Sequence, residues 1–565
     1  MNTMLRALLF FFIGIGIILR LYNLNWGSPY YFHPDERNIA SAVTKLHFPD
    51  KLNPEFFAYG SLPIYTIYFT GLLTNIFSNC VLETANCLPL EVPRSGTEWG
   101  SVSFEQAIVI SRIFSAVFSL ALLPLLYLLG KKIRNEVTGI IAVLLGAVSV
   151  GFIQFAHFGT FEMWLTFFGL LLFFLCLKLL ENQQKKYIIF TSIVLGILIA
   201  VKVSSLVLIP LPFLVLIFSI IAVKQHKRTQ VAKKMSILTI NTLILFGIAL
   251  CLYIISSPFV FFDYSSFQKS MKYESDVALG TLPVFYTGEF NNTIPVLYQF
   301  LHVYPFALNP LLTILFLPAF LYICFLTYKT KRPAYLLLIT CYVLLFLSSA
   351  FLFAKWVRYM IPTLPFMYLI LVIAMTDLLE QTKNSRKVVG FALGCVILIS
   401  CIFGVSYFIT AYARTDTRIN AAQWGGEHIP HDAAILSEVY DLGIVPFNST
   451  FSHITLFNIY DLDNDNTAKT QNDFAIALQK ADYIILPSQR IVQVRRTNPK
   501  QFPKGHMFYT ALLNNQLNFT KVYETTCDVF CKITYLNNPI YAFEQTANVF
   551  DRPVVMIFQK HANKN

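Results

Sequence analysis

Apolar runs separated by short polar connections fill the chain up to about residue 411. Most of these runs have the length that a helix needs to cross a bilayer, about 20 residues. The pattern therefore predicts about eleven membrane-spanning helices. They lie at about residues 5–22, 106–130, 138–157, 163–180, 187–201, 204–223, 236–257, 305–327, 334–354, 359–378 and 389–411.

Basic residues gather in every second connection between these runs. Cytoplasmic loops of membrane proteins carry an excess of Lys and Arg, so these connections are expected on the cytoplasmic side. The chain then begins in the cytoplasm and ends outside it. A cleavable signal peptide is the alternative for the first run, but no small-x-small site follows it, so we expect the run to be retained. The basic connections are 131–134, 185–186, 224–234, 329–332 and 383–387.

One further apolar stretch, Leu62 to Phe77, does not fit this count. As an additional span it would invert every later basic loop. A helix that lies in the outer interface preserves the topology. The sequence thus predicts a long first outer loop, 22–104, and a second one, 259–304.

From about residue 412 the chain changes character. Charged and Asn-rich stretches alternate with short β-type runs at 433–436, 483–486 and 554–558, and the stretch from Asp473 to Lys480 has a helical pattern. No glycine-rich phosphate loop is present. The expected fold class is a mainly α polytopic membrane protein, with a transmembrane domain at 1–411 and an extracytoplasmic α/β domain at 412–565.

Composition supports lipid as part of the solvent. The 565 residues are 56% hydrophobic and 13% charged, and soluble proteins carry about 25% charged residues. The net charge of +12 does not indicate nucleic acid, because many of the charges lie in the short connections. The ten cysteines show no metal-ligand spacing. Cys80 with Cys87, and Cys527 with Cys531, either form local disulfides or remain unpaired, since spacing alone does not decide.

The first candidate site residues are acidic. His33, Asp35, Glu36 and Arg37 follow the first span closely, and Glu162 begins the fourth span with almost no other charge nearby. Carboxylates at a membrane edge are costly without partners. A structural interpretation stays open, in which Asp35 caps a helix and Glu162 is an acidic helix start favoured by the helix dipole.

Basic candidates fall on the same predicted face. Arg112 lies in the outer part of the second span, Lys202 between the fifth and sixth, and Arg358-Tyr359 at the outer junction of the ninth and tenth. Each by itself could be an interfacial anchor. Together, cations to hold a phosphate and a carboxylate to deprotonate an acceptor hydroxyl are what glycosyl transfer from a lipid phosphate needs.

At these residues the chain resembles the multi-spanning GT-C glycosyltransferases that use lipid-linked sugars. The nearest branch is similar to the dolichyl-phosphate-mannose protein mannosyltransferases and the bacterial aminoarabinose transferases. The resemblance covers about residues 1–411. It rests on His33-Pro34-Asp35-Glu36, Gly60 to Tyr65, Ser111-Arg112-Ile113, Glu162, Pro258-Phe259 with Asp263, and Arg358-Tyr359 with Pro362.

The resemblance implies roles for these residues. Asp35 would be the general base or the residue that positions the acceptor, with Glu36 supporting it. Glu162 would take the family's second acidic position, which is more often Asp. The remaining roles are the carrier phosphate for Arg37, Arg112, Lys202 and Arg358, and support for His33, Tyr359 and Asp263.

The implied reaction is inverting transfer of a sugar from polyprenyl phosphate, outside the plasma membrane, to a glycan, lipid or protein acceptor. A divalent metal, Mg or Mn, serves some members of the family and not others. The C-terminal domain departs from the repeat module of the protein mannosyltransferases, which favours a bacterial-type envelope acceptor.

Competing interpretations are a transporter or flippase, a polysaccharide polymerase that uses a diphosphate-linked donor, and a receptor without catalysis. A transporter would place charges near the midplane in repeated halves, and neither feature is apparent here. If Asp35, Glu162 and Arg358 meet in one outward cavity, the enzyme interpretation gains most.

Overall fold

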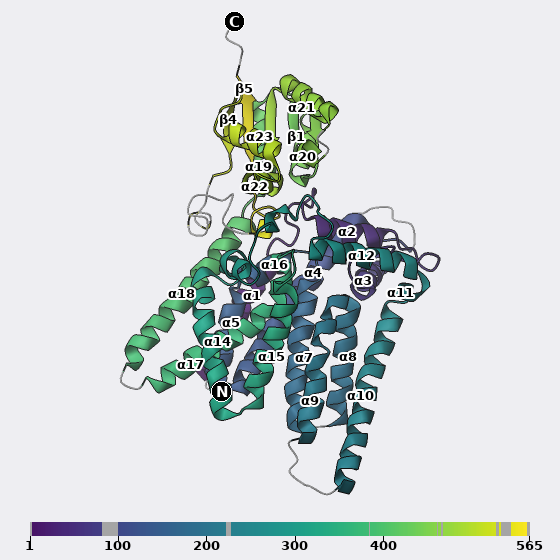
Figure 1. The fold of residues 1–565 in the computed structure, drawn as a ribbon, viewed down its shortest axis with the longest axis vertical. Helices are drawn as coiled ribbons and strands as arrows, with labels where there is room; N and C mark the ends of the chain where they lie inside the picture. The colour runs from purple at the N-terminus through teal and green to yellow at the C-terminus, as the bar shows by residue number, and fades with distance from the viewer. Residues whose placement is uncertain are drawn as a thin grey trace.

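The computed structural model describes residues 3–81, 100–182, 184–221, 228–382, 385–459, 461–464, 467–526, 530, 532 and 544–561. Cys87, Cys527, Cys531 and the Cys80 side chain lie outside this description, so both cysteine pairs stay predictions. Figure 1 shows a bundle of long helices below and a region containing a sheet above it. The chain is an integral membrane protein, because the bundle helices are long, apolar and extensively exposed to the surroundings.

Eight helices among the described residues are long and apolar enough to cross a bilayer, or nine with the bent pair α5 (Glu136–Ala147) and α6 (Val150–His157). The predicted count of about eleven is therefore not confirmed. Helices do occupy the other two predicted spans. However, α8 (Lys185–Val201) and the stretch Val203–Phe218 are shorter than the roughly 20 residues that a full crossing needs. The eight are α1 (Thr3–Leu21), α4 (Phe104–Ile133), α7 (Glu162–Asn182), Met235–Ser256 of α10 (Arg228–Ser256), α14 (Pro310–Thr330), α15 (Pro333–Ala350), Val357–Gln381 and α18 (Arg386–Ala411).

Shorter elements complete the bundle. Val203–Phe218 comprises η1 (Val203–Leu208) and most of α9 (Pro210–Ile221). Val357–Gln381 comprises α16 (Val357–Met360), η4 (Ile361–Thr363) and α17 (Leu364–Gln381). The π-helical turn η3 (Gln299–Val303) and α13 (Tyr304–Ala307) precede α14.

A buried arginine stabilises the 53° bend between α5 and α6. Arg20 of α1 donates to the last carbonyls of α5, those of Gly146 and Ala147, at 2.7 and 2.8 Å. Helix ends leave such carbonyls without partners, and a cation there also complements the helix dipole. Ser149 then caps the start of α6 through Phe152 N–H. Helix α6 ends at His157, a few residues before Glu162.

The first outer loop folds over the upper end of the bundle. Figure 1 shows α2 (Pro34–Thr44), α3 (Ser61–Val81) and α12 (Tyr264–Leu279) at this level, with α11 (Phe259–Phe262) beside them. The α3 helix contains the stretch predicted to lie in the interface, 62–77. Gly60 joins this loop to the end of α8, because its N–H donates to Val201 O at 2.9 Å. A Cβ at Gly60 would lie 1.8 Å from the carbonyl oxygen of Ala200, so no larger residue fits.

The C-terminal region contains a five-stranded sheet in the order β2-β1-β3-β5-β4. Strand β1 is parallel to β2 and β3, whereas β5 is antiparallel to β3 and β4. The three predicted β runs coincide with β1, β3 and β5, and the predicted helical stretch lies in α21. The bounds are β1 (Ile435–Glu438), β2 (Ile454–Phe457), β3 (Tyr483–Leu486), β4 (Phe519–Glu524), β5 (Met556–Lys560), α19 (Thr417–His428), η5 (Leu442–Ser449), α20 (Asp461–Asn464), α21 (Ala468–Lys480), α22 (Arg490–Thr497), α23 (Pro503–Leu513), η2 (Gly288–Phe290) and η6 (Gln545–Ala547).

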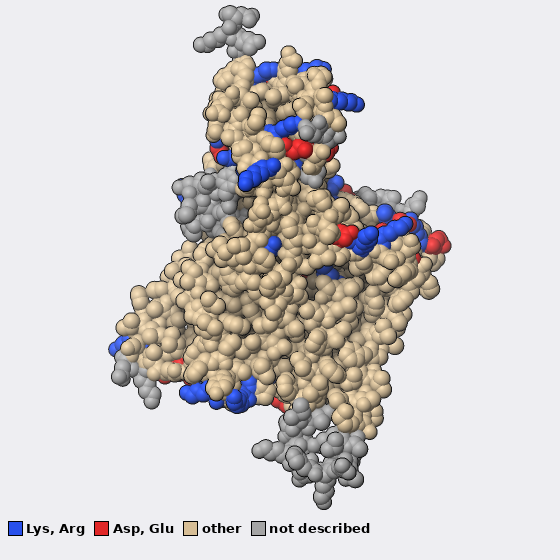
Figure 2. Space-filling view, viewed as in Figure 1, with Lys and Arg blue, Asp and Glu red and all other residues tan. Residues whose placement is uncertain are grey.

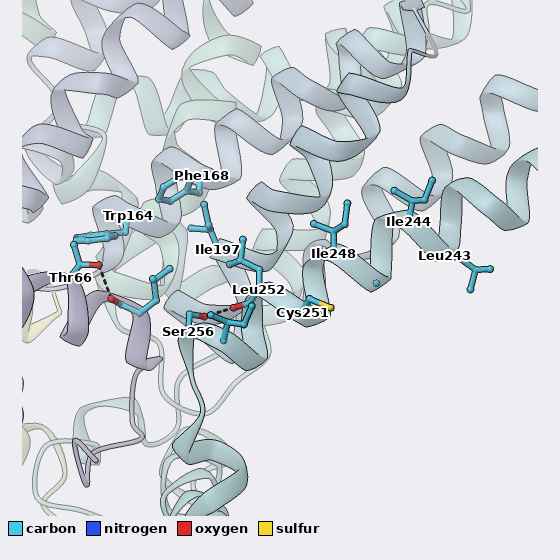
Figure 3. Close-up of a pocket in the computed structure, with 13 residues that line it drawn as sticks. Thr66, Trp164, Phe168, Ile197, Leu243, Ile244, Ile248, Cys251, Leu252 and Ser256 are labelled. Carbon is cyan, nitrogen blue, oxygen red and sulfur yellow. Dashed lines mark hydrogen bonds between the residues drawn. The ribbon is translucent and has the colours of Figure 1, made fainter. Parts of the chain in front are cut away.

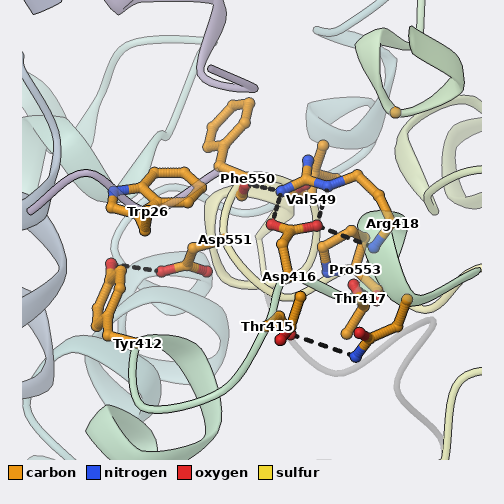
Figure 4. Close-up of polar contacts among 12 residues, drawn as sticks. Trp26, Tyr412, Thr415, Asp416, Thr417, Arg418, Val549, Phe550, Asp551 and Pro553 are labelled. Carbon is orange, nitrogen blue, oxygen red and sulfur yellow. Dashed lines mark hydrogen bonds and ion pairs between the residues drawn. The ribbon is translucent and has the colours of Figure 1, made fainter. Parts of the chain in front are cut away.

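The segment 544–553 fastens this region to the helices (Figure 4). Arg418 pairs with Asp416 and donates to Phe550 O at 2.6 Å. The buried Asp551 accepts hydrogen bonds from the hydroxyls of Tyr407 and Tyr412 at the end of α18. Because buried charged groups are stable only when paired or hydrogen-bonded, these contacts fix the segment against the bundle.

Charged side chains concentrate at the two ends of the bundle. Figure 2 shows Lys and Arg at the lower end, where Figure 1 places the N-terminus, and mixed charges at the level of the outer loop. The surface between them is nearly free of charge on this face, as a lipid-facing belt requires.

Candidate active site

Helix α2 begins at the upper end of the bundle and presents Asp35 in its first turn. His33 is the N-cap residue and Pro34 occupies the first helical position, which suits the fixed φ of proline. The Asp35 carboxylate forms an ion pair with Arg358 of α16 and accepts a hydrogen bond from Tyr59 OH at 3.4 Å. Two segments far apart in sequence therefore meet at Asp35.

The charge balance keeps Asp35 ionised. Burial alone would raise its pKa, but Arg358, His33, Lys202 and Arg490 together lower the pKa below its ordinary value. Burial lowers the pKa of the His33 imidazole, although the nearby carboxylates oppose that shift. His33 lies between the rings of Phe158 and Phe550, at 4.4 and 4.5 Å, and its buried Nδ1 has no partner among the described residues.

Glu36 and Arg112 form a separate, fully buried ion pair. Arg112 donates to both carboxylate oxygens of Glu36, at 3.0 and 2.7 Å, and to the carbonyls of Leu24 and Trp26, both at 2.9 Å. Gly159 N–H also donates to Glu36. The structure therefore does not support the expected role of Arg112 in phosphate binding, because its donors are used inside the protein. Glu36 supports the site by positioning α2 against α4, away from the reacting groups.

Glu162 is the first residue of α7 and is only 2% exposed. Neither of its carboxylate oxygens has a hydrogen-bond partner among the described residues. Its charge acts on His33, Lys202 and Arg358, so it faces the same space as Asp35. A buried carboxylate without a partner is expensive, and such a group is expected where a ligand completes its contacts.

Lys202 caps the C-terminal end of α8, held there by the contact of Gly60 with Val201. Its ammonium lies 5.1 Å from the Tyr59 ring and 5.4 Å from the Tyr359 ring. Within the described part of the chain it makes no ion pair. The Arg358 guanidinium packs 4.4 Å from the Trp356 ring, and its buried Nε has no partner among these residues. Lys202 can therefore receive an anion, and Arg358, although paired with Asp35, still has an unused N–H donor.

The remaining predicted residues lie elsewhere. Arg37 donates to Tyr30 O at 2.9 Å and packs over Phe104, and neither contact brings it to the cluster around Asp35. Asp263 is the N-cap of α12, and its hydrogen bond with Asn53, at 3.0 Å, holds the two outer loops together. That hydrogen bond also lowers the pKa of Asp263.

Sequence reasoning missed two members of the site. Glu274 of α12 interacts electrostatically with Arg358, Lys202 and Asp35, and burial raises its pKa despite the two cations. Arg490 opens α22 in the C-terminal region, yet its charge reaches Asp35. Nothing local in the sequence marks Arg490. Glu274, in the second outer loop, shares the predicted face with the other acidic candidates, and this was the one available signal.

An apolar groove lies between helices that include α7, which begins with Glu162, and α8, which Lys202 caps. It has a volume of about 790 Å³ and is lined by α3, α7, α8 and α10 (Figure 3). Trp164, two residues after Glu162, lies at one end, and Leu243 of α10 lies toward the other (Figure 3). A groove of this kind suits a long hydrocarbon chain.

A resident metal has no ligand cage among the described residues. No group of three or more His, Cys, Asp or Glu side chains is placed to hold an ion in that part of the chain. Asp35 and Glu162 are the acidic groups nearest to the proposed chemistry, and Asp35 is already paired with Arg358. The expectation of Mg or Mn stays untested, and the steps proposed below do not use a metal.

Known proteins share this architecture. The apo structure of the Archaeoglobus fulgidus oligosaccharyltransferase superposes with a TM-score of 0.53 at 12% identity, over 98% of this chain and 88% of that chain. The chain has the GT-C glycosyltransferase fold. The resemblance seen in the sequence is thus confirmed at the level of the fold.

Two further comparisons accompany this one. A family model described as dolichyl-phosphate-mannose-protein mannosyltransferase matches residues 103–254. ArnT from Cupriavidus metallidurans, in a structure bound to undecaprenyl phosphate, aligns at 10% identity over 85% of this chain and 92% of that chain, with a TM-score of 0.46. No curated protein sequence matches the chain. Fold does not fix function, so the function is argued from the site.

Proposed function

We propose that this protein transfers a sugar from a polyprenyl-phosphate donor to a hydroxyl of an envelope glycan, lipid or protein on the extracytoplasmic side of the membrane. One observation carries the proposal. An apolar groove reaches Trp164, next to the unpartnered Glu162, and the cations Lys202 and Arg358 lie in the same cluster. A lipid chain that ends in a phosphate has matching chemistry.

The donor would lie with its hydrocarbon chain in the groove and its phosphate at Lys202 and Arg358. Lys202 supplies a point charge, and Arg358 supplies directed N–H donors. As the bond between the anomeric carbon and the phosphate oxygen breaks, negative charge grows on the phosphate. Cations already fixed at that position stabilise the charge without reorganisation.

Asp35 would act as the general base. The acceptor oxygen attacks the anomeric carbon, its proton moves to an Asp35 oxygen, and polyprenyl phosphate leaves with the bonding electron pair, which inverts the anomeric centre. In the structure Arg358 pairs with Asp35. A bound donor phosphate competes for that guanidinium, so donor binding makes Asp35 a stronger base. The reaction is thereby coupled to donor loading.

Glu162 would hold the sugar. Its two unpartnered oxygens accept hydrogen bonds, and hydroxyl groups of a sugar are donors of the required kind. Its position at the start of α7, the helix that contributes Trp164 to the groove, agrees with this role. The family's second acidic position would then serve to orient the donor.

A second candidate function is transfer of an oligosaccharide from a diphosphate carrier. The specific observation in its favour is the likeness of the whole chain to an oligosaccharyltransferase, at a TM-score of 0.53. The two functions differ in the number of phosphates on the donor and in the size of the glycan. Both use the same base and the same groove.

The test is donor consumption in proteoliposomes that contain the purified protein. Radiolabelled sugars on polyprenyl monophosphate, and an oligosaccharide on polyprenyl diphosphate, are offered with glycan, lipid and peptide acceptors. The proposal predicts that one monophosphate donor is consumed and that polyprenyl phosphate accumulates with the labelled product. Consumption of the diphosphate donor alone, or of no donor with any acceptor, would contradict it.

A further inference from the structure

The Arg490 cluster, formed by Arg490, Phe285, Tyr286 and Tyr440, joins the second outer loop to the C-terminal region. Arg490 follows β3 and is the first residue of α22, and Tyr440 follows β1. Figure 1 shows α22 on the side of the sheet region that faces the bundle. The carboxyl ends of the parallel strands β1 and β3 therefore point toward the candidate active site. In open α/β sheets, that edge is where ligands bind.

The second outer loop and the C-terminal region both contribute side chains to this cluster. Phe285 of the outer loop and Tyr440 stack with ring centroids 4.3 Å apart and planes 15° apart. The Arg490 guanidinium lies 4.9 Å from the Phe285 ring and 5.9 Å from the Tyr286 ring. Asn498 at the end of α22 donates to Gly288 O at 3.0 Å, which fixes the helix against the loop. These contacts hold the Arg490 side chain at a fixed place between the loop and the C-terminal region.

The Arg490 guanidinium is poorly satisfied in this cluster. Its only hydrogen bond among the described residues runs from Nη1 to Tyr440 O and is long, at 3.4 Å. Its Nε is buried without a partner, and no carboxylate of the described chain forms an ion pair with it. Asp441, the nearest acidic residue in sequence, is engaged by Gly443 N–H and Ser488 OH. A half-buried guanidinium with unused donors requires an anion.

The acceptor is a better source of this anion than the donor. Lys202 caps α8, a helix that lines the groove, and both Lys202 and Arg358 pack on the Tyr359 ring, whereas Arg490 belongs to the C-terminal region. Asp35 interacts with both groups of cations. A general base must face the donor phosphate on one side and the acceptor hydroxyl on the other. This arrangement leaves the Arg490 side for the acceptor.

We propose that Arg490 binds an anionic group of the acceptor, a phosphate or a carboxylate, and so directs the neighbouring acceptor hydroxyl toward Asp35. The inference rests on the proposed function, because that function makes the bound molecule an acceptor. Anion binding at Arg490 can be measured without turnover. A planar guanidinium recognises both anions through paired N–H donors. The phenyl and phenol rings beside it suit the apolar face of a sugar.

The experiment measures binding to the full-length protein in detergent, without turnover. Glucose 1-phosphate, glucuronate and glucose serve as probes of matched size that carry a phosphate, a carboxylate and no charge. Polyprenyl phosphate is titrated in parallel as the probe of the donor site. The variants are Arg490→Gln, Arg490→Lys and Lys202→Gln, with Lys500→Gln as the control on an exposed residue of the same region.

We expect wild type and Lys500→Gln to bind one of the anionic sugars at least about tenfold more tightly than glucose. Arg490→Gln should lose this preference, and Arg490→Lys should retain part of it. Polyprenyl phosphate should bind Arg490→Gln within about twofold of wild type, which also reports that the variant is folded. Lys202→Gln should show the opposite pattern, weaker polyprenyl phosphate and unchanged anionic sugar.

Each other outcome has a defined meaning. Equal binding of anionic sugar by wild type and Arg490→Gln overturns the inference, and so does loss of polyprenyl phosphate binding in Arg490→Gln, which would place the anion on the donor. If neither the wild type nor any variant binds polyprenyl phosphate, the proposed function fails. A preference for anionic sugar that depends on Arg490 would in that case still establish the Arg490 cluster as an anion site. The stronger of the two anionic probes identifies phosphate or carboxylate.

Discussion

Two acidic side chains at the segment 544–553, the buried Glu544 and the half-buried Glu289, make a prediction about pH. Glu544 accepts a hydrogen bond from Val357 N–H at 3.2 Å, and Glu289 accepts one from Gln545 N–H at 3.2 Å. Burial raises the pKa of Glu544 to about 7, and burial together with the charge of Glu544 raises the pKa of Glu289. Both groups fasten the segment 544–553 beside the active site, so their protonation controls how firmly it is held.

The sign and size follow from linkage. Each carboxyl binds its proton more tightly in the folded protein, so the stabilisation is fully present below the unfolded pKa, 4.5, and is lost as the pH rises through the folded value. For Glu544 the shift from 4.5 to about 7 corresponds to about 3 kcal/mol at 1.36 kcal/mol per pKa unit. Most of that free energy is lost between about pH 5 and pH 8. Glu289 acts in the same direction.

The assay is thermal unfolding of the purified protein in detergent across this range. Wild type should lose stability from pH 5 to pH 8, and Glu544→Gln should show a much flatter dependence because its side chain stays neutral. Glu427→Gln, at an exposed position of α19, is the matched control and should follow wild type. The protection of the 544–553 amides, relative to their intrinsic exchange rate at each pH, should fall in the same window. Wild-type stability that increases toward pH 8, or a Glu544→Gln profile that matches wild type, would refute the reasoning.

Two other predictions concern the scaffold and the groove. Arg112→Gln should destabilise the fold by about 3–5 kcal/mol, because it leaves Glu36 charged and buried. The control Lys45→Gln removes one partner of an exposed ion pair and should cost under about 1 kcal/mol. Equal melting temperatures of the two variants would contradict the assignment of a buried pair. Gly247→Phe should fill the groove and weaken a long polyprenyl phosphate by about tenfold or more, with a geranyl phosphate less affected. Gly394→Phe, where a Cβ also meets nothing within 4 Å, should bind both lipids like wild type, and an equal loss in the two variants would argue against the groove.

Much of the fold was predictable because hydropathy is a local signal. The helices fall where the apolar runs predicted them, and β1, β3 and β5 coincide with the three β-type runs. The number of full spans was not predictable to the same degree. Length alone does not tell whether a helix of 17 residues, such as α8, crosses the bilayer completely, since tilt and local thinning also contribute.

The site shows where sequence reasoning reaches its limit. Asp35, Glu162, Lys202 and Arg358 do converge, because topology placed their segments at one end of the bundle. Glu36 was grouped with Asp35 because the two are adjacent in sequence. Neighbouring residues on a helix point about 100° apart, so Asp35 meets Arg358 while Glu36 meets Arg112 of α4.

Contacts between distant regions were beyond reach. The donors of Arg112 are used by Glu36 and by carbonyls of the first loop, and only the folded chain shows this. Arg490 lies more than a hundred residues beyond Arg358, in a region with its own sheet. A single sequence contains no local pattern that brings such a residue to Asp35.

The central claim is that Asp35 is the base for transfer from a polyprenyl-phosphate sugar. The most direct measurement is the rate at which the wild type, Asp35→Asn and Asp473→Asn turn over one polyprenyl-phosphate sugar in proteoliposomes. Asp473 is exposed on α21, so Asp473→Asn is the matched control. The account predicts a loss of about 10²- to 10⁴-fold in kcat for Asp35→Asn, polyprenyl phosphate binding retained, and Asp473→Asn equal to wild type. Undiminished turnover in folded Asp35→Asn protein would contradict it.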